Sequence, residues 1–130
     1  MPGTRAQAKN VIDNVTGYSS AAVTAGQVLW EYVSTVFGRL SGIKFLAVTA
    51  GSGAGNTVGD VLINGTSVWA AAGNKPTLLG TSTGEFANAV PDPNTRSIRP
   101  GDRITVQVNT IPATTGHARL MATVSIEGNA

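Results

Sequence analysis

The 130-residue chain has no cysteine and few charged residues. Without cysteine there is no disulfide framework, no thiolate nucleophile and no zinc site built on cysteine ligands. Charged residues make up 12% of the sequence, whereas an average soluble domain has roughly 25%. Because so sparse a charge does little to keep a free monomer apart from its neighbours, the composition favours a protein that works packed against others.

Long apolar runs and strong net charge are also missing. No apolar stretch approaches the ~20 residues that span a bilayer, and the first twenty residues lack the apolar centre of a signal peptide. Nine cations stand against seven anions, a net charge of +2, whereas nucleic-acid-binding proteins usually cluster many Lys and Arg on one face. We therefore expect neither a membrane nor a nucleic acid as partner, and no export by a signal peptide.

Catalytic and cofactor patterns are absent too. The one histidine, His117, would have to serve any Ser-His-Asp arrangement, and the chain has no G-x-S-x-G motif. The glycines of residues 51–56 follow neither phosphate-binding pattern, and a strand rather than a helix is expected after them. Asp60 with Asn56, or Asp92 with Asn94, could hold a cation, but such residues more often cap turns. We expect no enzyme, no metal and no cofactor.

Alternating side chains dominate the last third of the chain. Ile104, Val106 and Val108 alternate with polar residues, and the same pattern runs through residues 120–126. Successive side chains of a strand point to opposite faces, so each run offers one apolar face. The two runs, joined by residues 111–117, predict an antiparallel pair that needs a second sheet to cover it.

The rest of the chain supplies strands for that second sheet. Asn64-Gly65 between two β-forming runs predicts a hairpin, with Leu62 opposite Val68 or Val61 opposite Trp69. Residues 99–102, Arg-Pro-Gly-Asp, have the pattern of a type II turn. Other strands are expected at 27–37, 42–50, 77–80 and 85–90, with a turn at 38–39. About eight strands at this spacing predict an all-β, jelly-roll-like antiparallel sandwich over residues 26–130.

Residues 1–25 are small and polar, and we interpret them as an extended N-terminal arm. The alternatives are a helical turn around Val11, Ile12 and Val15, and a frayed tail. Deleting residues 1–20 is then expected to abolish partner binding and to leave a folded sandwich. A second candidate contact is the basic cluster around one turn. The candidate partner-binding residues are Arg5, Lys9, Val11, Ile12, Val15, Tyr18, Arg96, Arg99 and Arg103.

Three stretches carry a resemblance to a known family. SIRPGDRITVQV, then ARLMATVSIEG after a loop, and the earlier INGTSVW resemble the small β-sandwich domains of tailed-phage virions. The resemblance implies a capsid decoration (cement) protein that is made in the host cytoplasm without a signal peptide and binds the capsid exterior. Its partner would be the major capsid protein, and the chain would form a homo-oligomer, a trimer rather than a dimer.

The resemblance also leaves a second function open. Such domains form tail-fibre or receptor-binding heads that recognise a host-surface glycan or protein. In that case the site would be built from the loops at 51–56, 70–76 and 112–116. Trp69, beside the second of these loops, would be the aromatic platform for a sugar.

Overall fold

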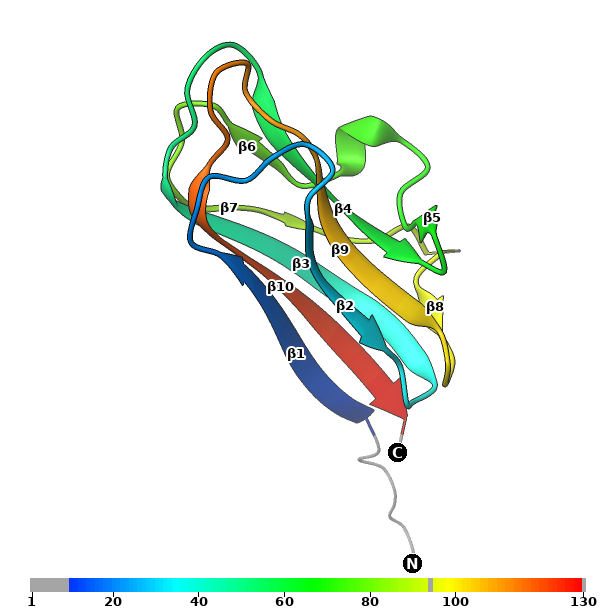
Figure 1. Ribbon diagram of the computed structural model, residues 1–130. Coiled ribbons are helices and arrows are strands. Elements are labelled where there is room, and N and C mark those ends of the chain that lie inside the picture. The colour runs from blue at the N-terminus through cyan, green and yellow to red at the C-terminus, as the bar shows by residue number, and fades with distance from the viewer. Residues whose placement is uncertain (1–9, 94, 130) are drawn as a thin grey trace, which may run out of the picture.

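A computed structural model, which describes residues 10–93 and 95–129, consists of two facing antiparallel sheets (Figure 1). The first sheet contains β1 (Asn10–Ser19), β10 (Ala118–Asn129), β3 (Gly38–Thr49), β7 (Gly84–Ala89) and β8 (Ser97–Ile98). The second contains β2 (Val28–Val33), β9 (Arg103–Thr110), β4 (Asn56–Ile63), β5 (Thr66–Ser67) and β6 (Thr77–Leu79). The predicted all-β sandwich is confirmed. No helix in the described ranges is long and apolar enough to cross a membrane.

The alternating residues of β9 and β10 form the centre of the core. Ile104, Val106 and Val108 of β9 are fully buried, as are Leu120 and Val124 of β10. Their polar neighbours in sequence lie on the outer faces, as a period of two requires. The sequence pattern therefore identified the apolar core side chains of these strands correctly, whereas Thr105, expected to face water, is buried at 7% exposed.

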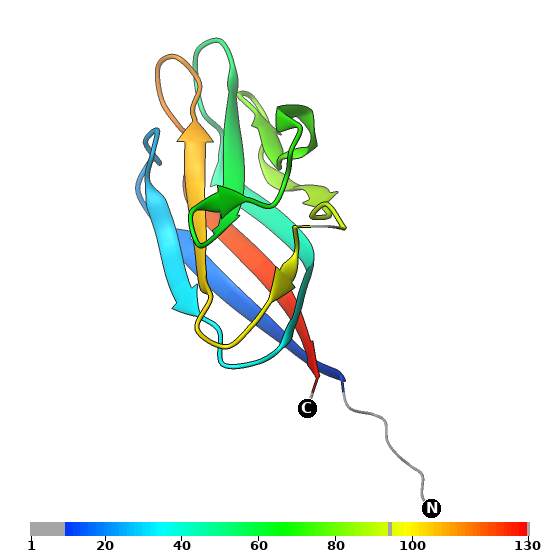
Figure 2. The ribbon, with the colours of Figure 1, turned by 90° about the vertical axis from the view of Figure 1, so that its right-hand side faces the viewer.

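The predicted pairing of these two strands is wrong. β9 lies between β2 and β4 in the second sheet, whereas β10 lies between β1 and β3 in the first. Figure 2 shows the two strands in different layers. Their apolar faces cover each other across the core, and residues 111–117 cross between the sheets. The end of this crossing is anchored where Val23 donates its N–H to the carbonyl oxygen of His117 at 2.8 Å.

The Asn64-Gly65 hairpin is confirmed, with both residues at positive φ, 51° and 87°. Its register differs from the expected one, because Leu62 pairs with Ser67 and Ile63 with Thr66. The same register continues one step further, because the N–H of Val68 donates to the carbonyl oxygen of Val61 at 3.0 Å. The side chain of Val68 is fully buried.

The N-terminal arm is wrong for residues 10–25. Residues 10–19 are the strand β1, which pairs with β10 from Asn10 opposite Asn129 to Ser19 opposite Leu120. Val15 packs against the core, and Val23, just beyond β1, is 1% exposed. The sandwich therefore includes residues 10–25, which the arm interpretation placed outside it. The arm predicted for residues 1–9 lies outside the described residues.

The structure differs from the predicted strands in two smaller ways. Gly38 and Arg39, expected as a turn, begin β3 and pair with Ile98 and Ser97 of β8. The described residues contain ten strands where about eight were expected. The two additional strands are β1, which was assigned to the arm, and β8, whose two residues are too few to leave a period in the sequence.

Candidate partner-binding face

Apolar side chains, two of them exposed, line up across the outer face of the first sheet. Tyr18, Met121 and Leu46 lie in register on β1, β10 and β3, and we call these three residues the apolar row. Tyr18 is 53% exposed and Met121 37%. Val48, two residues beyond Leu46 on the same face, is 52% exposed. Neighbouring exposed apolar residues, unlike single ones, are typical of interaction surfaces.

A polar row runs beside the apolar one. Thr16, Thr123 and Lys44 lie in register on the same three strands, and the hydroxyl oxygens of Thr16 and Thr123 are 3.2 Å apart. Both rows therefore belong to one continuous face, which is apolar toward the Ser19 end of β1 and rich in hydroxyl groups toward its middle.

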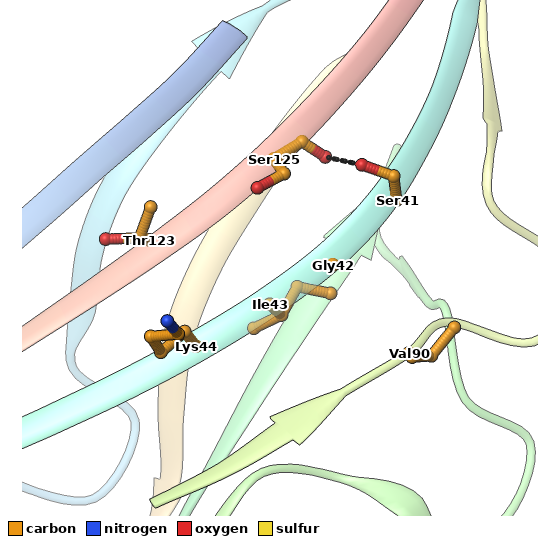
Figure 3. Close-up of a pocket in the computed structure, with 7 residues that line it drawn as sticks. All are labelled: Ser41, Gly42, Ile43, Lys44, Val90, Thr123 and Ser125. Atoms are coloured by element: carbon orange, nitrogen blue, oxygen red, sulfur yellow. Dashed lines mark hydrogen bonds between the residues drawn. The ribbon is translucent and has the colours of Figure 1, made fainter. Parts of the chain in front are cut away.

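A groove of about 530 Å³ opens at the polar end of this face (Figure 3). Across it, the Ser41 hydroxyl donates to the carbonyl oxygen of Ser125 at 3.3 Å. Gly42 keeps part of the groove open, because a Cβ at this position would meet nothing within 4 Å. The groove is lined by Ser41, Gly42, Ile43, Lys44, Val90, Thr123 and Ser125. Hydroxyl groups and one ammonium group suit the backbone and polar side chains of a protein partner.

A second groove, of about 520 Å³, lies where β3, β8 and β10 meet. Phe37, 61% exposed, lies on its rim beside Arg99. Another lining residue, Arg39, is occupied, because its Nε and one terminal nitrogen contact the same Oε1 of Glu127 at 2.8 and 2.7 Å. This groove therefore offers an exposed aromatic ring but few free charges.

The candidate residues of the N-terminal stretch lie in different environments. Tyr18 is exposed on the outer face, whereas Val15 is directed to the core and is not available there. The backbones of Val11 and Ile12 pair with residues 128 and 127 of β10. Arg5 and Lys9 lie outside the described residues.

The three arginines predicted to act together lie on either side of β8 and at the start of β9. Arg103 begins β9 on the second sheet, with its Nε 3.8 Å from Glu31. Arg99 lines the second groove. Arg96 contributes its backbone carbonyl, which accepts the N–H of Leu40 at 2.9 Å. The joint role of these three arginines in partner binding stays a prediction.

His117 is fully buried and both ring nitrogens have partners. Nε2 donates to the carbonyl oxygen of Ser82 at 3.0 Å, since a carbonyl can only accept. Nδ1 lies 2.7 Å from the Thr57 hydroxyl. No carboxylate contacts either nitrogen through these bonds, so this ring is built into the core and not into a Ser-His-Asp arrangement.

Asp60 is 3% exposed and fully occupied by protein donors. Its Oδ1 accepts from the Ser67 hydroxyl and the Val61 N–H, and its Oδ2 contacts Lys75 Nζ and Asn109 Nδ2, each at 3.0 Å. Within the described residues no group of three or more His, Asp or Glu side chains could hold a metal ion. The carboxylate of Asp60 thus ties the loop after β5 to the outer side of the second sheet.

Trp69 is a core residue. It is 2% exposed, and its indole N–H donates to the carbonyl oxygen of Val90 at 2.9 Å. It cannot present an open ring to a sugar, so the sugar-platform interpretation loses its main candidate.

The apolar row was only partly anticipated. Tyr18 was among the candidate residues, but Leu46, Val48 and Met121 were not. The sequence does contain a signal for these residues. They alternate with the core residues of their strands, so they fall on the face where polar side chains are expected. An apolar residue on the solvent parity of a strand is the feature that points to this face.

No known family model matches the chain, and no curated protein matches it. Among solved structures, dimeric latent PorU from Porphyromonas gingivalis is similar at 10% identity and a TM-score of 0.47. The match covers 98% of this chain and 14% of the PorU chain. A likeness this distant assigns no family. The class of protein that fold and face define is an all-β antiparallel sandwich with an exposed apolar row on one sheet.

Proposed function

We propose that this chain is a structural protein of a phage particle that binds the outside of the assembled capsid, through the major capsid protein, and stabilises it. The observation that carries the proposal is the apolar row of Tyr18, Leu46 and Met121 on the outer face of a sheet, with Tyr18 and Met121 exposed and Leu46 half-buried, in a chain with few charges. Aromatic residues and Met are enriched, and Lys and Glu depleted, in protein interfaces.

Binding to a shell needs only a modest contact per copy. A capsid repeats one surface many times, so linked copies of a weak binder gain avidity through effective concentration. A ligand that binds the assembled shell and not its dissociated subunits stabilises the shell by mass action. Such a function requires an exposed face and no catalytic group.

The test uses particles from which the protein has been removed. Wild-type protein is added back, its binding is measured by co-sedimentation, and the melting temperature of the shell is recorded. Tyr18→Asp with Met121→Asp should abolish both binding and stabilisation. Val28→Asp with Val33→Asp places the same charges on β2 of the second sheet, where Val28 and Val33 are 48% and 57% exposed, and should leave both intact.

Two results would contradict the proposal. One is equal binding by wild-type protein and the Tyr18/Met121 variant. The other is a location at the tail tip instead of the shell, seen by antibody labelling of intact particles, which would favour the tail-fibre or receptor-binding head.

A further inference from the structure

β1 is a long edge strand with one side unpaired in the described structure. All ten of its residues pair with β10 in a continuous register, and no other described strand pairs with β1. Figure 1 shows it as the outermost ribbon of the first sheet. Its free side therefore presents a row of backbone N–H and C=O groups, which is a template for another strand.

The other edges of the sandwich are irregular or short. The pairing of β2 shifts between Val28 and Trp30, and the pairing of β7 shifts opposite Lys44 and Leu46 of β3. β5, β6 and β8 have two or three residues. Natural sheets protect exposed edges with bulges, short strands, prolines and lysines. β1, with the sequence NVIDNVTGYS, has ten residues in continuous register and no proline or lysine, and Asp13 is its one charged residue.

We infer that the free edge of β1 pairs with the β1 edge of a second copy of this chain, antiparallel and about a two-fold axis, so that the two first sheets form one continuous sheet. A second copy fits because Val15, Thr16, Gly17, Tyr18 and Ser19 carry no charge, so a strand paired with itself meets no repulsion there. A two-fold contact is self-complementary and closes after two chains, which avoids a fibre.

The symmetry has a consequence for binding. An axis perpendicular to the sheet leaves both outer faces on the same side, so the dimer presents two apolar rows to one surface. This consequence rests on the proposed function, whereas the dimer itself does not. The contact between copies would be a dimer and not the trimer that the resemblance implies.

The test is the mass in solution of the full chain, measured by light scattering after size exclusion over a concentration series. Wild-type protein should approach twice the chain mass of 13.2 kDa. Thr16→Lys places a charge at the edge and should weaken the dimer by about tenfold. Thr123→Lys is the matched control, because Thr123 is the cross-strand partner of Thr16 on the same face but lies on the inner strand β10.

A monomer or a trimer at all concentrations would overturn the inference, and so would equal effects of the two lysines. If Thr16→Lys does not fold, hydrogen exchange on wild-type protein decides. Edge pairing protects the outward amides of β1 at high concentration and releases them on dilution. Unchanged exchange of these amides on dilution into the monomer range would refute the pairing. Loss of capsid binding with an intact dimer would count against the proposed function alone.

Discussion

Gly17 of β1 lies directly against the indole ring of Trp30 in β2. A Cβ at this position would lie 1.8 Å from Cδ1 of Trp30, so the indole ring occupies the space that a side chain would need. Trp30 in turn stacks edge-to-face with Tyr32, with ring centroids 6.3 Å apart. Glycine is therefore required here for its size, and any larger residue must displace an aromatic pair.

Gly17→Ala should lower the free energy of unfolding by about 1–3 kcal/mol, the usual cost of overpacking. Gly42→Ala is the control, because Gly42 also lies in a strand but a Cβ there meets nothing within 4 Å. Its stability should stay at or slightly above that of wild type. Urea unfolding of the three proteins measures both effects, and equal midpoints for the two variants would contradict the packing of Trp30 on Gly17.

The Asp60–Lys75 ion pair differs from the surface pairs in its burial. The side chains of Asp60 and Lys75 are 4% and 17% exposed, whereas those of Arg39 and Glu127 are 50% and 25% exposed. Lys75→Met leaves a buried carboxylate without its cation, though with its three hydrogen bonds, and should cost about 1–3 kcal/mol. Arg39→Met should cost less than about 1 kcal/mol. Thermal or urea unfolding compares the two, and the reverse order would show that Lys75 contributes no more than a surface cation.

At the scale of elements, the two turns that carry the phage resemblance are bonded to each other. Asn64 Nδ2 donates to Oδ1 of Asp102 at 3.0 Å, and the Asn64 side-chain oxygen accepts the N–H of Arg103 at 2.9 Å. Asp102 also accepts the N–H of Arg99 within its own turn at 2.9 Å. Since these residues join β4–β5 to the start of β9, we interpret the shared motifs as structural and not as a binding site.

The same bonds make this junction sensitive to acid. The hydrogen bond from Asn64, followed by that from the Arg99 backbone, lowers the pKa of Asp102 below its usual range. A lowered pKa in the folded state means that the contribution to stability is full above the unfolded value, about 3.9, and is lost as pH falls through the folded value. Asp102→Asn should therefore reduce stability at pH 6, and its difference from wild type should shrink below about pH 4.

Urea unfolding of wild type and Asp102→Asn at a series of pH values measures this difference. NMR titration of the Asp102 carboxyl group gives its pKa directly. A difference in stability that is constant from pH 6 to pH 2 would show that the charge of Asp102 does not stabilise the junction.

The sequence predicts which face of a strand is buried better than it predicts which strands pair with each other. The alternation of Ile104, Val106 and Val108 states which side of a strand is apolar, and the structure confirms it. Alternation does not indicate which strand lies alongside in the sheet, because the apolar face can be buried whichever strands are its neighbours. Pairing was therefore right only where local turn chemistry determines it, at Asn64-Gly65, and wrong for β9 and β10, whose connection has no tight-turn signal.

At the scale of the whole molecule, the candidate site also depends on strand neighbours that the sequence does not predict. Tyr18 was selected from the sequence as part of an arm, and its exposure on the outer face agrees with a binding role but for another reason. The apolar row exists only because β1, β10 and β3 are adjacent in the sheet. Residues so far apart in sequence are brought into register by topology, which local patterns do not contain.

The incorporation of β1 into the first sheet reverses the expected effect of a deletion. Removing residues 1–20 takes away the whole of β1, exposes the edge of β10 and uncovers Trp30. It also removes the partly buried Val15 together with ten backbone pairings to β10. These losses together should exceed the contribution of one fully buried side chain of that kind, about 1.5–3 kcal/mol. We now expect this deletion to unfold the protein or to destabilise it by at least that amount, where the arm interpretation predicts a stable sandwich.

Removing residues 1–9 is the matched control, since it leaves every described strand in place. Its unfolding midpoint and circular dichroism should equal those of the full chain. Because the shorter deletion keeps the fold, any loss of capsid binding that it causes can be assigned to the first nine residues. A Δ1–20 protein as stable as the full chain would instead show that β1 adds nothing to the stability of the sandwich. That result would also contradict the proposed dimer, because the dimer requires β1 to be the edge strand of the first sheet.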